Sequence, residues 1–538
     1  MTETGERAMI KSALSMVAAA LLVWDGAGAP AHAEEAMIVR GSGDNWQSLD
    51  PHINYSAKDS HILGDIYEGL VGVDAAGAPV PAAAESWTVD PSGLIYTFHL
   101  REGLAWANGS PIVAQDFVRG MQRLLDPSTA SYKAYYLINA VPVTGAGPYN
   151  SGNVKEFSSV GIEAPDDRTV ELKLDRPNPH TLELLNFYAI VPSPAELKSG
   201  DEFADPGKGF ANGAYMLKEV VPQSHILLVK NPNYWDAASV KVPAIKYLVT
   251  EDVNTELKLY ESGQVDITND VPVERFKELR ERAGDALHVA PIARVVFLSF
   301  NVKKGPLADR RIREALTLAI DRRILEEKVM AAGDLPIRSY VPPVEAGYPA
   351  LAPKDLSEDH AANVARAKSL LDEAGYATSN PLKVKFDCFS DNSWKRRAEA
   401  IAVMWQQTLG VVSEMHFQET QAHWDAFYNY EWEVYCDSLS GDYAAAEPFL
   451  VYRTEAAGAG YPWVNADFEA KIATATAKLN TDQRNAALSE AEQILLDDYV
   501  LAPLSAVTSR RLIAERVQGW IDNPVDYHLS KYLSLRSE

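Results

Sequence analysis

The side chains best suited to chemistry are spread along this chain without the spacings that catalysis needs. The eleven histidines are scattered, and the sequence contains no His-Glu-x-x-His pair, Gly-x-Ser-x-Gly turn or phosphate-binding glycine loop. Acidic residues are so numerous that any two could be chosen as a catalytic pair, and such a choice carries no information. We therefore expect no catalytic step, no metal and no cofactor.

The two cysteines, Cys388 and Cys436, are the other reactive groups. Each falls on the apolar face of a predicted strand, and Cys436 is in line with Trp432 and Val434. In an oxidising compartment an even number of cysteines favours a disulfide, which requires Cα atoms within about 7 Å of each other. Two buried free thiols are the alternative.

The N-terminus has the pattern of a secretory signal. A polar stretch with Lys11 precedes an apolar run over 13–24, and small residues lead to the cleavage motif Ala31-His32-Ala33. The run is far shorter than the roughly 20 residues that cross a bilayer. We expect cleavage after Ala33 and a periplasmic location. Because no cysteine lies nearby to accept a lipid, we expect no membrane anchor.

Length and charge narrow the class further. A mature chain of about 500 residues exceeds what one hydrophobic core supports, so two or three domains are expected. The formal net charge is −24, and an acidic surface repels phosphate backbones and anionic membranes. Nucleic acid is therefore a poor candidate partner.

Hydrophobic periodicity predicts strands and helices mixed along the whole chain. Alternating apolar residues predict half-buried strands, and an unbroken apolar run predicts a central one. These strands cover 94–100, 169–174 and 382–388, with the central strand at 295–300. Helical spacing predicts helices over 312–320 and 367–374, the second ending at Gly375. The mixture indicates α/β lobes whose boundaries the chain crosses more than once.

Short motifs follow one another through nearly all of the mature chain. The first group is Ala84-Glu-Ser-Trp87, Tyr96-Thr-Phe-His-Leu-Arg101, Trp106-Ala-Asn-Gly-Ser-Pro111 and Ala114-Gln-Asp-Phe117. The second group is Gln47-Ser-Leu-Asp-Pro-His52, Asp126-Pro-Ser-Thr-Ala-Ser131, Asn212-Gly-Ala-Tyr215, Asn231-Pro-Asn-Tyr-Trp235, Ser262-Gly-Gln-Val-Asp266 and Leu370-Leu-Asp-Glu-Ala-Gly-Tyr376. In content and order they resemble the oligopeptide-binding proteins, the family 5 solute receptors of ABC importers.

The resemblance implies a bilobed α/β fold, the Venus-flytrap fold of periplasmic binding proteins, with mixed sheets, an inserted domain and two hinge crossovers. The family boundaries give a discontinuous first domain, an inserted second domain and a third domain. These comprise 34–67 with 193–293 and 507–538, then 68–192, then 294–506. Ligand would lie between the first and third domains, and hinge closure would bury it.

The resemblance also implies two modes of ligand contact. Asp442 matches an aspartate that binds the ligand's α-ammonium group, since a charge in a closed cleft must be paired. An exposed turn acid is the alternative for this residue. Extended peptide backbone would pair with protein strands, and the matching segments are Tyr55-Ser56-Ala57 and Leu439-Ser440-Gly441. Trp424 matches a pocket aromatic, with a core tryptophan as the alternative.

Several positions depart from the family. Trp394 and Cys436 stand where a histidine and an arginine hold the C-terminal carboxylate of peptides in the enterobacterial receptor, so that clamp is expected to be absent. Lys133 replaces a site tyrosine, either as a new cationic contact or as a solvated surface lysine. Arg294 and Ser440 occupy the positions of the relatives' disulfide, which therefore cannot form.

The implied role is that of a monomeric receptor for short peptides. It would deliver them to ABC permease subunits with cytoplasmic ATPases. The departures make a cell-wall peptide, an opine-like conjugate or another modified peptide the alternative ligand. A periplasmic sensor or folding helper is the alternative role.

Overall fold

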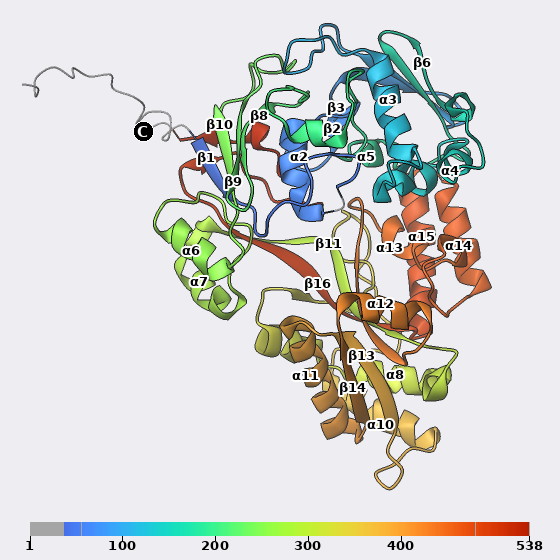
Figure 1. Cartoon of the computed structure of the whole chain (residues 1–538). Coiled ribbons are helices and arrows are strands. Elements are labelled where there is room, and N and C mark those ends of the chain that lie inside the picture. The colour runs from blue at the N-terminus through green and yellow to red at the C-terminus, as the bar shows by residue number, and fades with distance from the viewer. Residues whose placement is uncertain (1–36, 55, 479, 537–538) are drawn as a thin grey trace, which may run out of the picture. The chain divides into compact units, whose positions relative to one another are not determined.

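The structure is a computed structural model that describes residues 37–54, 56–478 and 480–536. The predicted signal and its cleavage site at Ala33 lie outside these residues. No helix in the described part of the chain is long and apolar enough to cross a membrane. Strands and helices alternate through it and form three main sheets and two strand pairs (Figure 1).

The first sheet combines the start of the described chain with a segment about two hundred residues later. Its order is β1-β10-β9-β8, with bounds Met37–Gly41, Ala244–Leu248, His225–Lys230 and Tyr215–Val221. Strands β8, β9 and β10 are antiparallel neighbours. Helix α2 (Ser60–Ile66) buries Ile62, Leu63 and Ile66 in the core that this sheet shares.

The second sheet lies within a single stretch of sequence. Its order is β4-β5-β7-β6, with bounds Ala84–Val89, Ile95–Leu100, Thr169–Lys173 and Ile162–Asp166. The helices of this stretch are α3 (Ala114–Leu125), α4 (Ala146–Asn150) and α5 (Thr181–Leu185), with a π-helix, η3, over Tyr136–Ala140. Two short pairs complete the small sheets: β2 (Val71–Val73) with β3 (Pro79–Pro81), and β17 (Val517–Gln518) with β18 (Ser534–Leu535).

The third sheet has six strands in the order β12-β16-β11-β15-β13-β14. Their bounds are Leu335–Pro336, Leu501–Leu512, Leu287–Phe300, Val434–Ser440, Lys383–Phe389 and Val412–Gln418. Strand β11 is buried on both faces because Val296 and Leu298 enter one apolar cluster while Val295 and Phe297 enter another. This is the pattern of a strand covered by helices on both sides.

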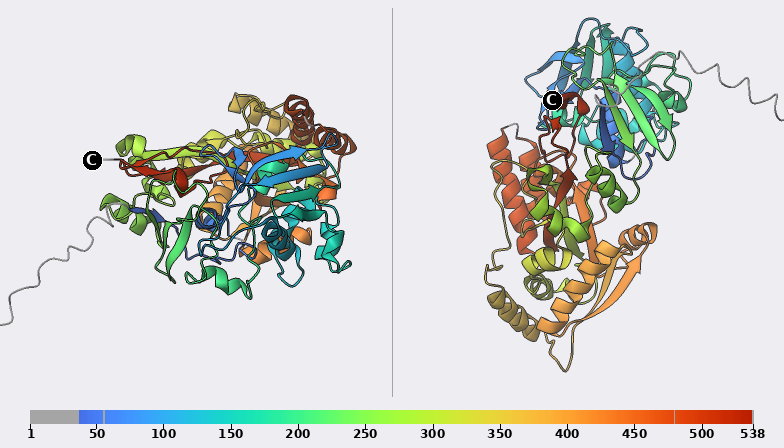
Figure 2. Two further views of the ribbon diagram at one scale, coloured as in Figure 1. Left: turned by 90° about the horizontal axis from the view of Figure 1, so that it is seen from above. Right: turned by 90° about the vertical axis from the view of Figure 1, so that its left-hand side faces the viewer.

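Two helical layers cover this sheet, as the right-hand view of Figure 2 shows. Helices α8 (Arg310–Leu318), α10 (His360–Glu373) and α11 (Asn392–Leu409) contribute Leu316, Leu371 and Trp405 to the first cluster. Helices α13 (Glu447–Val451), α14 (Ala466–Thr476) and α15 (Thr481–Asp497) cover the other cluster. The remaining helices are α6 (Val253–Glu261), α7 (Phe276–Arg282), α9 (Arg322–Ile324) and α12 (Thr420–Tyr428).

Strands β11 and β16 lead from the six-stranded sheet toward the first sheet (Figure 1). They pair antiparallel from Ser299↔Leu501 to Leu287↔Leu512. Just beyond β16, Ile513 bridges to Ile267, which in turn bridges to Arg40 in β1. Two paired strands therefore connect the two sheets, as a two-strand crossover requires.

The elements predicted from periodicity are confirmed. Strand β5 buries Tyr96, Phe98 and Leu100 on one face, and 295–300 forms the buried half of β11. Helix α8 covers most of the predicted 312–320, and α10 ends beside Gly375, whose φ of +87° is the left-handed conformation expected after a helix.

The cysteines lie on neighbouring parallel strands, Cys388 on β13 and Cys436 on β15. Their Cα atoms are 4.9 Å apart and the structure joins them in a disulfide. Both side chains are fully buried. The bond would tie together two strands that share only a short stretch of pairing, Phe386↔Val434 and Asp387↔Tyr435.

Candidate ligand-binding site

Asp442 lies two residues beyond the end of β15. It contacts Tyr135 and Tyr136, which are three hundred residues away in sequence. The hydroxyl of Tyr135 donates to its two carboxylate oxygens at 3.0 and 2.9 Å, and the hydroxyl of Tyr136 donates to one of them at 2.6 Å. The Asp442 side chain remains exposed. Its carboxylate is therefore fixed in place and open to a further donor.

The two tyrosines are neutral donors at any physiological pH. Burial is the main cause that raises the pKa of Tyr135 and of Tyr136, and the neighbouring Asp442 charge raises both further. Neither tyrosine was predicted as a site residue. The sequence could have indicated them through Lys133, an expected site residue, because Tyr135 and Tyr136 follow it by two and three positions.

Lys133 lies in the same group of side chains. It is half-buried, and its Nζ is 5.0 Å from the ring centroid of Phe187, 5.8 Å from that of Tyr136 and 6.0 Å from that of Tyr188. Desolvation lowers the pKa of Lys133, and the Asp442 carboxylate acts in the opposite direction. This environment differs from that of a solvated surface lysine, the alternative expectation. A direct ligand contact stays a prediction.

Strand β15 offers main-chain groups next to Asp442. On one side it pairs with β11, with Ser440 opposite Arg294 and Leu439 opposite Val295, and the Gly441 N–H donates to the Ala293 carbonyl at 2.7 Å. On the other side, the pairing with β13 found among the described residues ends at Tyr435. This open edge suits the addition of an extended peptide, so contact through Leu439, Ser440 and Gly441 remains a prediction.

The second segment predicted to bind as a strand takes a different conformation. Tyr55 lies outside the described residues, while Ser56 is irregular and Ala57 begins a 3₁₀ turn, η1 (Ala57–Asp59). The prediction of a strand was wrong for Ser56 and Ala57. The cause is the side chain of Asn54, whose Oδ1 accepts the Ser56 N–H at 2.9 Å and bends the chain.

The segment nevertheless reaches the site. The Ser56 carbonyl accepts the hydroxyl of Tyr188 at 3.4 Å, and Tyr188 is one of the rings beneath Lys133. Ser56 and Lys133 therefore contact the same tyrosine. Binding of a ligand by Tyr55, Ser56 or Ala57 stays a prediction.

Trp424 and Trp394 flank one aromatic ring. Trp424 on α12 lies 6.2 Å from Phe389 and 6.4 Å from Tyr435, centroid to centroid. Trp394, in the first turn of α11, lies 5.7 Å from Phe389. Both tryptophans are half-buried. Each therefore presents part of its ring to solvent, which is compatible with a pocket wall, and their site roles remain predictions.

Cys436 occupies a different environment from the other candidates. Its side chain is fully buried in the core on one face of β15 and bonded to Cys388. It presents no surface that a ligand could touch in this structure. The expected loss of the carboxylate clamp at this position therefore has a structural reason.

Near Asp442, His180 contacts the carboxylate of Glu447. Its Nε2 lies 3.1 Å from Oε2 of Glu447 on α13, and its ring is 4.4 Å from that of Tyr443. Burial lowers the pKa of His180, but Glu183 and Glu447 outweigh burial and the nearby Arg484, so that the pKa is raised. His180 thus links the expected inserted domain to the expected third domain, and protonation of its ring would strengthen this contact.

This contact predicts a pH-dependent stability. A histidine with a raised pKa in the folded state stabilises the protein fully below its ordinary pKa of about 6.5 and loses this contribution as pH rises through the folded value. His180→Gln should therefore lower the unfolding free energy more at pH 6 than at pH 9, measured by urea unfolding. His360→Gln, a half-exposed histidine at the start of α10, is the matched control. An equal loss for His180→Gln at both pH values would contradict the ion pair.

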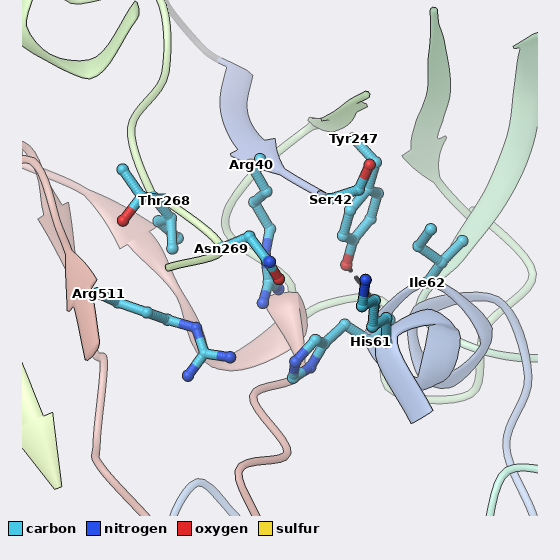
Figure 3. Close-up of a pocket in the computed structure, with 11 residues that line it drawn as sticks. Arg40, Ser42, His61, Ile62, Tyr247, Thr268, Asn269 and Arg511 are labelled. Atoms are coloured by element: carbon cyan, nitrogen blue, oxygen red, sulfur yellow. Dashed lines mark hydrogen bonds between the residues drawn. The ribbon is translucent and has the colours of Figure 1, made fainter. Parts of the chain in front are cut away.

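A small pocket lies elsewhere, beside β1, α2 and β10 (Figure 3). The residues that line it include Arg40, Ser42, His61, Tyr247, Asn269 and Arg511. Arg40 donates to Oγ of Ser530 and Arg511 to the carboxylate of Asp526, each at 2.9 Å. Burial lowers the pKa of His61, so that it stays neutral. Arg40 and Arg511 thus have partners within the protein, and none of the expected site residues that the structure describes lines this pocket.

Metal chemistry finds no support in the described residues. Within them, no group of three or more histidine, cysteine, aspartate or glutamate side chains is arranged to hold a metal ion. The arrangement at Asp442 consists instead of a fixed carboxylate, neutral hydroxyls, aromatic surfaces and an open strand edge. Such groups can bind a ligand that carries an ammonium group and an extended backbone.

Comparison with known proteins assigns the class. The model of the bacterial extracellular solute-binding proteins, family 5, matches residues 78–461, and the chain belongs to this family. It is 33% identical over 503 residues to the periplasmic murein peptide-binding protein MppA of Escherichia coli, covering 93% of each chain. The fold is therefore that of the bilobed family 5 receptors, with mixed sheets and two crossover strands.

Solved structures agree. The structure of the Escherichia coli murein tripeptide binding protein MppA matches with a TM-score of 0.78 at 32% identity, covering 93% of this chain and 99% of that one. Haemophilus influenzae OppA in complex with the peptide RPPGFSPFR matches with a TM-score of 0.76 at 29% identity, with the same coverage. These relatives are binding proteins.

Proposed function

We propose that this chain is the peptide receptor of an ABC importer. The observation that carries the proposal is the position of Asp442: a fixed, exposed carboxylate at the end of a strand whose next main-chain groups have an open edge. An ammonium group and an adjoining extended backbone are what the N-terminal end of a peptide presents. The resemblance to OppA, solved with a peptide, supports the same ligand class.

Location and transport partners are part of the proposal. The A-x-A motif ending at Ala33 would be cleaved, and the mature chain would work in the periplasm, as the name of its relative MppA states for that protein. It would deliver peptides to permease subunits driven by cytoplasmic ATPases. No catalytic step is part of this role.

The three-part division of the chain is also a proposal. The first sheet draws its strands from 37–41 and 215–248, within the expected discontinuous first domain. The second sheet uses 84–173, within the expected insertion. The central part of the third sheet falls within 294–506, and β11 and β16 extend past both ends of that range. These positions support the division without fixing its edges.

A cell-wall peptide is the second candidate ligand. The resemblance to MppA, a murein peptide-binding protein, and the expected absence of the family's carboxylate clamp at Trp394 and Cys436 favour it. A murein stem peptide carries an α-ammonium group like any peptide, so Asp442 would serve both ligands. The two candidates differ in the rest of the site.

Thermal unfolding and calorimetry with defined peptides test the proposal. The ligands are tri-, tetra- and pentaalanine and the stem tripeptide L-Ala-γ-D-Glu-meso-diaminopimelate. A ligand at a hundred times its Kd should stabilise the protein by about 2.7 kcal/mol, which a melting curve resolves easily. Unchanged melting temperature and no measurable heat with every peptide would contradict a peptide receptor.

A further inference from the structure

Arg294 is an exposed cation at the start of the buried half of β11. Its neighbours in β11, Ala293 and Val295, are 5% and 0% exposed, whereas the Arg294 side chain is open to solvent. In the pairing of β11 with β15 it stands opposite Ser440, two residues before Asp442. Because directly opposed residues share a face of the sheet, Arg294 lies on the same face as Ser440 and Ser438.

The guanidinium reaches over β15. Its Nη2 donates to Oγ of Ser438 at 3.0 Å, which brings the charge toward the strand with the open edge. Arginine has five N–H donors, and this is the one side-chain hydrogen bond that the described structure gives Arg294. Most of its donors therefore remain available.

No carboxylate neutralises Arg294 at close range. Among the described residues none lies within 4.0 Å of its guanidinium, and the acid that acts on it most, Asp334, has other partners. Asp334 accepts the Thr508 N–H at 2.9 Å and lies 3.9 and 4.0 Å from the neighbouring arginines Arg397 and Arg510. Among the described residues, Arg294 is thus a cation without a carboxylate partner of its own.

The two neighbouring arginines differ from Arg294 in this respect. Arg397 is paired with Glu326 at 3.4 Å, and Arg510 is paired with Asp270 at 3.1 Å. Desolvation by the surrounding protein lowers the pKa of Arg294 although its side chain remains exposed.

The spacing along β15 suits a short ligand. Asp442 and Ser438 are four residues apart, which is at most roughly 13 Å at about 3.3 Å per residue, because β15 ends at Ser440 and Asp442 lies in a bend. An extended tri- or tetrapeptide spans about this distance between its ammonium and its terminal carboxylate. A ligand with its ammonium at Asp442 would therefore bring a carboxylate near Arg294.

Trp394 lies close to the same group of charges. Its ring is 5.4 Å from the guanidinium carbon of Arg397, and the charge of Arg397 is one of those that act on Arg294. Trp394, at a position where the enterobacterial receptor has a carboxylate-binding side chain, is thus near Arg294, which stands where relatives have a disulfide cysteine. Arg294 lies on β11 and not at either clamp position, but its guanidinium can likewise bind a carboxylate.

We propose that Arg294, anchored by Ser438, is an anion subsite that binds a carboxylate of the ligand at the end opposite Asp442. This inference rests on the proposed function, since it assumes a peptide along β15. Arginine pairs with carboxylates through two parallel hydrogen bonds. The subsite therefore selects ligands with an anionic group at a fixed distance from their ammonium.

Calorimetry with matched acids and amides tests this inference. The probes are tri- and tetraalanine, each with a free or amidated C-terminus, and Ala-Ala-Glu-amide, which carries its carboxylate on a side chain. Of trialanine and tetraalanine, the free acid that binds the wild type more tightly should bind it about tenfold or more tightly than the corresponding amide does. Arg294→Gln should reduce that ratio to less than about twofold, mainly by weakening the free acid, and Arg294→Lys should fall between.

Arg396→Gln is the matched control, because it removes the same charge from an exposed position on α11 and should keep the wild-type ratio. Tight binding of Ala-Ala-Glu-amide that depends on Arg294 would assign the subsite to a side-chain carboxylate. An acid-to-amide ratio near one in the wild type, or a ratio that Arg294→Gln preserves, would overturn the inference alone. No binding of any probe would contradict the proposed function and this inference with it.

Discussion

Asp442→Asn should weaken the binding of free-amine peptides by about 2–5 kcal/mol, the cost of truncating one half of a desolvated charge pair. This corresponds to a loss of about 30-fold or more in affinity. Asparagine keeps the size and one acceptor oxygen, so the hydroxyls of Tyr135 and Tyr136 retain a partner. What the variant lacks is the charge that an ammonium group requires inside a closed site. Isothermal titration calorimetry with trialanine measures the difference.

The ligand supplies the sharpest control for this prediction. N-acetyl-trialanine has no ammonium group, so wild type and Asp442→Asn should bind it equally and weakly. Asp425→Asn removes an exposed acid from α12 and should leave trialanine binding unchanged. If Asp442→Asn binds trialanine as tightly as the wild type does, Asp442 is an exposed turn acid and not part of the site.

Reduction of the bond between Cys388 and Cys436 should lower the free energy of unfolding by up to about 4 kcal/mol, the chain-entropy value for a loop of 48 residues. The bond connects β13 and β15 close to the segment that ends at Asp442. Its loss should therefore affect stability first and ligand affinity second. Urea unfolding with and without dithiothreitol measures the first effect, and calorimetry measures the second.

Peptide mapping under non-reducing conditions checks the bond itself, since a linked peptide pair should appear and vanish on reduction. The double variant Cys388→Ala/Cys436→Ala is the control and should unfold identically with and without reductant. Free thiols in protein purified under oxidising conditions would favour the alternative of two buried cysteines. In that case reductant should leave the wild-type unfolding curve unchanged.

The fold could be predicted from the sequence where the hydrophobic pattern was strong. Val295 to Phe300 is apolar on both faces, and such a run has few stable places except the centre of a covered sheet. The helix ending at Gly375 was equally clear, because periodicity and the C-terminal glycine agreed. The division among sheets came from family resemblance, since pairing between distant strands leaves little trace in local sequence.

The site was less predictable. Asp442 came from the resemblance, but Tyr135 and Tyr136 depend on packing across three hundred residues, which no local pattern encodes. The strand predicted at Ser56 and Ala57 was wrong because the Ser56 N–H donates to the side chain of Asn54 and the chain bends there. Arg294 was noted only as a lost cysteine, and its unpaired charge became visible once its surroundings were known.

The hydroxyls that hold Asp442 before a guest arrives also bear on unloading. Among the described residues, the groups hydrogen-bonded to the Asp442 carboxylate are two uncharged phenols, so an incoming ammonium does not have to displace an ion-paired cation. When the ligand leaves, the hydroxyls of Tyr135 and Tyr136 can again donate to the carboxylate. In the empty receptor the Asp442 charge therefore keeps hydrogen-bond partners. The rate of ligand release to the permease would then be limited by the opening of the protein and not by electrostatic attraction at the Asp442 site.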